Sequence, residues 1–249
     1  MPRLLVINPN TSDSVTTLLH THVSAHAGPG VPVEAVTARL GAPYIACEAS
    51  YAVAGHAALD AWAAALVAPA EAPDGILIGC FGDPGLFALQ SCSPVPVTGL
   101  AEAAFAQAAR RGRFAVVTGG AAWDPMLRRL AMALGHGETL AGIVTVAPSG
   151  AELAANPQLA NRLLFQACRD AAAMKGVQSV IVGGAGLAGL ADVLQPDLDF
   201  PLIDSVAAGA QELLAAIAEG RVSGSHQVPG CDVAWSGVSP ELRALGRVG

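Results

Sequence analysis

The chain has 249 residues, of which 53% are apolar and 13% charged, and it carries a net charge of −7 at pH 7. This length can bury a large core, so we expect a compact α/β protein rather than a disordered or fibrous one. The acidic balance, without a clustered basic face, argues against nucleic acid as a partner. The apolar stretches end well before the ~20 residues that a membrane span needs, and residues 1–8 do not resemble a signal peptide. Five scattered cysteines without a CxxC pair predict a reduced, metal-free, cytoplasmic protein.

Strand and helix signals alternate along the chain, which predicts parallel sheets covered by helices. Strands are predicted at residues 4–7, 31–36, 76–78, 94–98, 114–118, 143–146 and 180–182. Helices are predicted from the turn at residues 8–12 to near Gly28, from Asp83 onward, and over residues 50–68, 101–111, 121–134 and 157–175. Asp83 is predicted to be the N-cap of its helix and Pro84 the first helical residue. Asn156 and Pro157 form a similar start signal, and Cys168 inside the helix that follows is interpreted as a packing residue.

Cys80 stands on a glycine-rich turn directly after the predicted strand at residues 76–78. In open α/β sheets, ligands bind at the carboxyl ends of the strands. A thiol beside exposed peptide N–H groups and a helix N-terminus is expected to have a lowered pKa. The alternative is a small buried cysteine in a packed turn, but the flanking glycines favour a reactive thiol.

Two other segments are predicted to reach the same edge of the sheet. Asn10, Thr11 and Ser12 follow the first strand, where they either contact a ligand or cap the next helix. Tyr44 and Ile45 lie in a loop that is predicted to cover the site, although a half-buried loop tyrosine is the simpler interpretation of Tyr44.

The second half of the chain repeats the first. Residues 78–82 align with residues 182–186 so that every glycine of the first segment meets a glycine of the second, and the match extends from Gly85-Leu86 to Gly189-Leu190. Two related halves facing a cleft would present equivalent groups to opposite faces of one substrate, as inversion at carbon requires. Cys80 occupies the first of these positions and Gly184 the second.

Four motifs together carry a family resemblance: residues 8–11, 79–86, 119–123 and 183–190. With them the chain resembles, from Leu4 to about Glu219, the hydantoin racemase branch of the aspartate/glutamate racemase superfamily. The resemblance implies two pseudo-symmetric α/β lobes, each a parallel sheet flanked by helices, with a cofactor-independent active site in the cleft between them. It also implies a homo-oligomer. Family members use two cysteines, one from each lobe. By position the first is Cys80, and the second should stand where this chain has Gly184.

The resemblance further implies proton transfer by Cys80 at the α-carbon of an amino-acid or hydantoin-like substrate. Turn amides near Cys80 and Gly184 would stabilise an enolate-like intermediate. The remaining residues expected to contact a small-molecule substrate are Asn10, Thr11, Ser12, Tyr44, Ile45, Phe81, Gly82, Asp83, Thr118, Gly119, Ala185 and Gly186. The missing second thiol leaves two alternatives open. These are a single-cysteine decarboxylase or isomerase of small carboxylic acids, and a catalytically retired small-molecule binding protein.

The repeat also suggests domain limits. Residues 1–98 are predicted to form the first lobe, completed by residues 205–225, and residues 99–204 the second lobe. Residues 226–249 are predicted to be a C-terminal tail.

Overall fold

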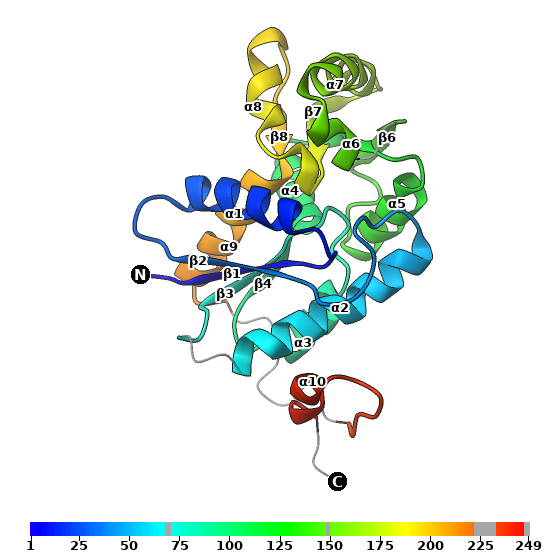
Figure 1. The fold of residues 1–249 in the computed structure, drawn as a ribbon. Helices are drawn as coiled ribbons and strands as arrows, with labels where there is room; N and C mark the ends of the chain where they lie inside the picture. The colour runs from blue at the N-terminus through cyan, green and yellow to red at the C-terminus, as the bar shows by residue number, and fades with distance from the viewer. Residues whose placement is uncertain (68–70, 148–149, 222–232, 247–249) are drawn as a thin grey trace.

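The computed structural model describes residues 1–67, 71–147, 150–221 and 233–246, which form two α/β lobes (Figure 1). Each lobe contains a four-stranded parallel sheet, with strand orders β2-β1-β3-β4 and β6-β5-β7-β8. The strands of the first sheet are β1 (Leu4–Asn8), β2 (Val33–Thr37), β3 (Gly75–Ile78) and β4 (Val97–Gly99). Those of the second are β5 (Arg113–Gly119), β6 (Leu140–Val146), β7 (Val177–Gly183) and β8 (Leu202–Asp204). The predicted two-lobe α/β fold is confirmed.

The two lobes that correspond to the sequence repeat also have similar backbone structures. Both sheets have the same strand order, so β1 corresponds to β5 and β3 to β7. Gly85 and Gly189, which the sequence repeat pairs, both adopt the left-handed conformation, with φ of 86° and 79°. Each directly precedes a short helix, α3 (Leu86–Cys92) or α8 (Leu190–Leu194). Glycine is favoured at both positions because it carries no Cβ to clash in this region.

The prediction that Asp83 caps a helix beginning at Pro84 is wrong. Helix α3 begins only at Leu86, and Asp83 has a φ of 53°. The Asp83 carboxylate instead accepts hydrogen bonds from the N–H groups of Ala101 (2.9 Å) and Glu102 (2.7 Å), at the start of helix α4 (Leu100–Ala109). Local spacing could not reveal this cap, because the helix it serves begins 17 residues later in the chain.

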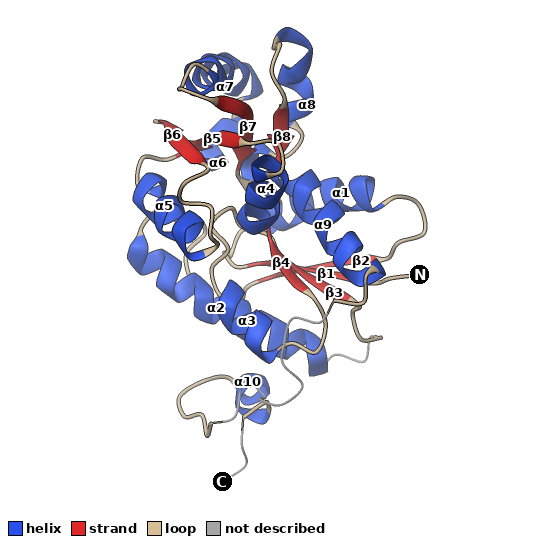
Figure 2. Ribbon diagram, turned by 180° about the vertical axis from the view of Figure 1, so that it is seen from behind, coloured by secondary structure: helices blue, strands red, loops and turns tan. Residues whose placement is uncertain are grey.

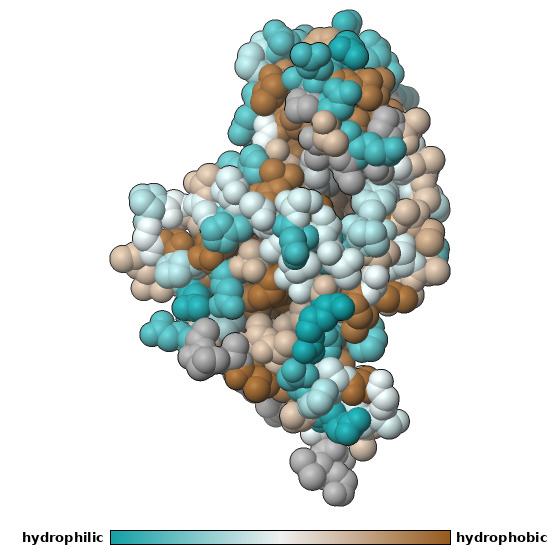
Figure 3. Space-filling view, in the orientation of Figure 1, coloured by the Kyte–Doolittle hydropathy of each residue, from teal (hydrophilic) through white to brown (hydrophobic). Residues whose placement is uncertain are grey.

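Helices cover both faces of each sheet. On the first sheet, α1 (Asp13–Ala27) and α9 (Ser205–Ala218) pack on one face and α2 (Glu48–Val67) and α3 on the other (Figure 1). On the second sheet, α7 (Pro157–Ala172) packs on one face, and α4 and α5 (Trp123–Ala133) on the other. Much of the surface in Figure 3 is pale to tan, as expected for helices rich in alanine.

The two lobes share a core because two helices cross between them. Helix α4 follows β4 but packs against β7, whereas α9 follows β8 but packs against α1 and β3. Leu4 and Val6 of β1 therefore belong to the same buried cluster as Phe114 and Val116 of β5. The domain limits, including the completion of the first lobe by residues 205–225, stay predictions.

Helix α7 begins as predicted, since the Asn156 side chain accepts the N–H of Leu159 and Pro157 stands in the first turn. Cys168 on this helix is fully buried, which confirms its packing role. Strand β8 and helices α6 (Gly150–Ala155), α8, α9 and α10 (Pro240–Ala244) were not predicted. Helix α10 lies in the predicted tail and packs against α2 (Figure 2), whereas residues 226–232, with Cys231, lie outside the described residues.

Within the described ranges, the structure has no helix long and apolar enough to cross a membrane. The same residues contain no group of three or more His, Cys, Asp or Glu side chains placed to hold a metal ion.

Candidate active site between the lobes

A cavity lies between the two lobes, at the carboxyl ends of the central strands. The first lobe lines it from the end of β1, from α1, from the loop before α2 and from the turn after β3; the second lobe lines it from β5, α5 and the turn after β7. The lining residues are Asn10, Val15, Tyr44, Ile45, Gly79, Cys80, Phe81, Thr118, Gly119, Trp123, Gly183, Gly184, Ala185, Gly186 and Leu187. Strand ends from both sheets thus meet at one site, as the repeat predicted.

Cys80 is held at the end of β3 with 8% of its surface exposed. The Gly79 N–H donates to the carbonyl of Ile7 (2.8 Å), and the Asp83 N–H donates to the carbonyl of Cys80 (3.0 Å). The N–H groups of Cys80 and Phe81 make no hydrogen bond with any residue that the structure describes. This turn therefore offers a thiol and two free peptide donors to the cavity.

The expectation of a lowered Cys80 pKa is wrong. Burial raises the pKa of the Cys80 thiol, and the nearby Asp83 carboxyl raises it further. Burial also raises the pKa of Asp83 to about 8, against the N–H groups of Ala101 and Glu102, which lower it. Peptide donors favour the thiolate, but the loss of water around a buried thiol disfavours it and decides the direction of the shift. In the empty cavity, Cys80 is consequently a proton donor at neutral pH.

The equivalent turn of the second lobe is built around Gly184. This residue has φ 147° and ψ 134°, a backbone conformation in which residues with a side chain are strained. Its N–H donates to the Ser205 hydroxyl (3.2 Å), while the N–H groups of Ala185 and Gly186 find no partner in the described parts of the chain. A Cβ at Gly184 would lie 3.3 Å from the Leu187 side chain. This face of the cavity therefore presents peptide donors and an apolar side chain.

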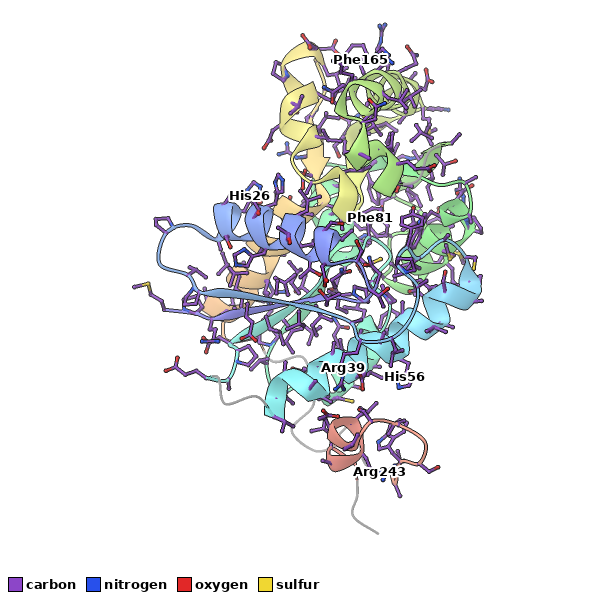
Figure 4. All side chains as sticks on the ribbon, viewed as in Figure 1. His26, Arg39, His56, Phe81, Phe165 and Arg243 are labelled. Atoms are coloured by element: carbon purple, nitrogen blue, oxygen red, sulfur yellow. The ribbon has the colours of Figure 1, made fainter. Side chains whose placement is uncertain are left out.

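Phe81 joins the two turns (Figure 4). Its ring fills the space beside Gly183, where an added Cβ would overlap it, and packs edge-on against Phe105 at 5.9 Å between centroids. Only a glycine at position 183 allows the first-lobe ring to approach the second-lobe strand so closely. Phe81 thus lines the cavity and also forms part of the contact between the lobes.

Asn10 is the main polar side chain of the first lobe in the cavity. Its Oδ1 accepts hydrogen bonds from Asn8 Nδ2 (3.0 Å) and from the Ser12 N–H (2.9 Å). Because the oxygen is used in this way, the Nδ2 group remains available as a donor toward a ligand. Thr118 of β5 adds a hydroxyl that is 5% exposed.

Four of the predicted contact residues do not line the cavity. The Thr11 N–H donates to Ala42, and Ser12 is the N-cap residue of α1, with its hydroxyl bonded to that of Ser14. Gly82 accepts a hydrogen bond from the Tyr51 hydroxyl (2.7 Å), and the Asp83 carboxylate faces α4. Their proximity to the motifs in sequence did not bring their side chains to the site.

Other residues line the cavity without having been predicted: Val15, Gly79, Trp123, Gly183 and Leu187. The apolar ones carry no chemical signature. Trp123 and Leu187 could have been indicated by their place in the glycine-rich motifs, whereas Val15 of α1 lies outside them. Among the residues that line the cavity, none is Lys, Arg, His, Asp or Glu. A ligand with a full charge would therefore meet no opposite charge there.

The family model for Asp/Glu/Hydantoin racemase matches residues 4–213 of the chain. The chain belongs to the Asp/Glu/hydantoin racemase family. It is 30% identical over 234 residues to the hydantoin racemase of Paenarthrobacter aurescens, covering 91% of this chain and 97% of that protein. It is 27% identical to the hydantoin racemase of Pseudomonas sp. (strain NS671), covering 84% and 83%. Among solved structures, the allantoin racemase from Klebsiella pneumoniae is similar over 100% of both chains, with a TM-score of 0.89 and 29% identity.

These comparisons confirm the predicted membership of the Asp/Glu/hydantoin racemase family, its hydantoin racemase branch, and the prediction that the protein is an enzyme that acts on a small molecule. The roles of individual residues stay predictions. The departure from the two-thiol pattern lies at Gly184, which faces the cavity from the second lobe.

Proposed function

We propose that this member of the racemase family transfers a proton at the α-carbon of a neutral, hydantoin-type ring, with Cys80 as an acid–base group. One observation carries the proposal: a thiol and unpaired peptide N–H groups lie at a cavity whose described lining residues include no charged side chain. The similarity to hydantoin racemases along most of the chain supports the same substrate class.

The uncharged lining favours a ring over a free amino acid. An amino acid would bring an ammonium and a carboxylate into a site without counter-charges, at a cost of several kcal/mol per ion. A hydantoin is neutral and presents two carbonyl oxygens. The peptide donors of the two turns and the Asn10 Nδ2 group match those acceptors.

The chemistry follows from these groups. When Cys80 is a thiolate, its sulfur removes the hydrogen from the α-carbon and the negative charge moves onto the neighbouring carbonyl oxygen. Free N–H groups directed at that oxygen stabilise the enolate, because they are already oriented before the charge develops. The Cys80 thiol then returns a proton to carbon. Since burial raises the pKa of Cys80, we expect the rate of proton removal by this residue to increase with pH through the neutral range.

Deuterium exchange tests the proposal directly. One enantiomer of 5-benzylhydantoin is incubated with the protein in D₂O, and the loss of the C5–H signal is followed by NMR. We expect exchange above the rate without enzyme for the enantiomer whose hydrogen faces Cys80, and loss of that exchange in a Cys80→Ser variant. Cys47→Ser removes an exposed thiol that does not line the cavity and is the matched control. Absence of exchange by the wild type across hydantoins of different 5-substituent would overturn the proposal and favour a retired binding protein.

One observation favours a second candidate, a single-cysteine decarboxylase. Such an enzyme needs only a proton donor, because loss of CO₂ creates the carbanion, and the raised pKa of Cys80 keeps that thiol protonated. Release of CO₂ from phenylmalonate by the wild type, abolished in Cys80→Ser, would select this function over the first. The uncharged lining argues against it, since a malonate is an anion.

We further propose that the protein is a cytoplasmic homo-oligomer. The family resemblance supports the assembly, and the scattered cysteines without a CxxC pair support a reducing compartment. Light scattering after size-exclusion chromatography tests the assembly, and a monomer at micromolar concentration would contradict it.

A further inference from the structure

Tyr44 belongs to a first-lobe loop, but its hydroxyl reaches the second lobe. The hydroxyl donates to the carbonyl of Gly119 at the end of β5 (3.4 Å), and a Cβ on Gly120 would lie 3.3 Å from the same oxygen. The loop is tied to the end of β1 by the hydrogen bond from the Thr11 N–H to Ala42 (3.1 Å). Arg39, just before the loop (Figure 4), is fixed by a two-point contact with Asp60 on α2. These contacts hold the loop in a position from which Tyr44 extends across the cleft to the second lobe.

The strand register places this hydroxyl at the end of β5, next to the strand that leads into Gly184. Strands β5 and β7 are parallel neighbours, and their last paired residues are Thr118 and Gly183. Gly119 and Gly184 each follow directly on that pair, so the carbonyl that holds Tyr44 lies next to the second-lobe turn. Gly184 is the position that the internal repeat aligns with Cys80. The Tyr44 hydroxyl thus stands near the place where a second acid–base group would be needed.

Tyr44 is also the one other suitable group among the residues that line the cavity. A side chain that gives a proton to carbon and takes one back must be an acid of moderate strength, such as a thiol or a phenol. Cys80 carries a thiol and Tyr44 a phenol. The remaining polar side chains of the lining are an amide, a hydroxyl and an indole: Asn10, Thr118 and Trp123. Tyr44 is partly exposed, so its hydroxyl can also exchange protons with solvent.

We propose that Tyr44 is the second proton carrier of the site, acting on the substrate face opposite Cys80 in place of the thiol absent at Gly184. The inference rests on the proposed function. One enantiomer gives its C5 hydrogen to the Tyr44 phenolate while the Cys80 thiol protonates the other face, so the site ends with a phenol and a thiolate. The other enantiomer gives its hydrogen to that thiolate and receives the phenol proton, which restores the first form. Each turnover conserves the number of protons and inverts the carbon.

The test compares exchange with inversion in Tyr44→Phe, which keeps the ring and loses the hydroxyl. Each enantiomer of 5-benzylhydantoin is incubated in D₂O; NMR follows C5–H, and chiral chromatography follows inversion. We expect inversion to fall at least ~100-fold, the usual contribution of an acid–base group. Exchange with retention should persist for the enantiomer whose hydrogen faces Cys80 and be lost for the other. This asymmetry separates proton transfer from a structural role, which would lower all rates together.

Two further variants make the result decisive. Tyr51→Phe removes the hydroxyl of the other tyrosine in the chain, which donates to Gly82 and does not line the cavity; it should leave the ratio of exchange to inversion unchanged. Tyr44→His supplies a different proton carrier and should recover part of the inversion that Tyr44→Phe loses. Inversion by Tyr44→Phe at the wild-type rate would overturn the role of Tyr44 while leaving the proposed function intact. A wild type that neither exchanges nor inverts the substrate would overturn both.

Discussion

The Asp83 carboxylate occupies the space that a side chain on Gly99 would need. From there it accepts the first N–H groups of α4. In the second lobe the residue equivalent to Gly99 is Asp204, which accepts the N–H groups of Val206 and Ala207 at the start of α9 and that of Gly189 in the turn after β7. Each lobe therefore places one carboxylate at the helix that crosses to the other lobe, but from a different position in the chain.

We expect a variant that moves this carboxylate from position 83 to position 99 to keep most of its stability. A variant that deletes the carboxylate should lose stability. Asp83→Gly leaves the first N–H groups of α4 without their acceptor and should lower the free energy of unfolding by about 1–2 kcal/mol. The double variant Asp83→Gly/Gly99→Asp copies the second lobe and should recover most of that loss, since Gly99 has a φ of −102° that aspartate adopts readily. Gly99→Asp alone should be the least stable, because two carboxylates would compete for one space. Urea denaturation measures the free energy of unfolding of all three variants. A double variant no more stable than Asp83→Gly would contradict the prediction that a carboxylate at position 99 can cap α4.

The Cys80 thiol should be alkylated slowly at neutral pH. Because burial and Asp83 raise its pKa, the reactive thiolate is scarce, and the rate should rise about tenfold per pH unit without a plateau below pH 9. Asp83→Asn removes the negative charge that this carboxyl carries above its pKa of about 8, so above that pH the variant should be labelled faster than the wild type. Iodoacetamide labelling must be followed on the Cys80 peptide by mass spectrometry, since hydrogen bonds from Ser50 lower the pKa of the exposed Cys47, which reacts first. A plateau near pH 7 would show that the thiol is not held protonated.

Restoring a thiol at position 184 should carry a structural cost. The φ of 147° at Gly184 strains any residue with a side chain, so Gly184→Cys should lose about 1–3 kcal/mol of stability. Gly184→Ala has the same backbone cost without the thiol and is the control for any change in inversion rate. Thermal denaturation of both variants measures this loss of stability. A melting temperature equal to that of the wild type would mean that the turn rearranges easily.

The contact between Phe81 and Gly183 should be sensitive to one methyl group. Gly183→Ala places a Cβ inside the Phe81 ring and should destabilise the protein by about 1–3 kcal/mol through overpacking. Adding Phe81→Leu should relieve part of that loss if the overlap is its cause. A double-mutant cycle by urea denaturation gives the coupling between the two positions. If the changes in unfolding free energy of the two single variants simply add in the double variant, steric overlap between the two side chains is not the cause of the loss.

Much of the fold was predictable because it depends on local patterns and on the repeat. Apolar runs identified seven of the eight strands, all but β8, and glycines at matching positions, such as Gly85 and Gly189, identified the two lobes. Short elements without strong periodicity, such as α6, α8 and α10, were missed because few residues define them. Cys80 and Gly184 were predicted to face one cleft, and both line it.

The sequence by itself determined the strand-end motifs, the thiol at Cys80 and the absence of one at Gly184, because these properties belong to single residues and their neighbours. Only the tertiary structure decided how each group behaves. Burial raised the Cys80 pKa, and the Asp83 carboxylate accepts hydrogen bonds from a helix that begins 17 residues later. The Tyr44 hydroxyl donates to Gly119 at the end of β5, whose neighbour β7 leads into Gly184. Each of these depends on atoms that are distant in the chain, since solvation, capping and reach are set by what packs nearby in space.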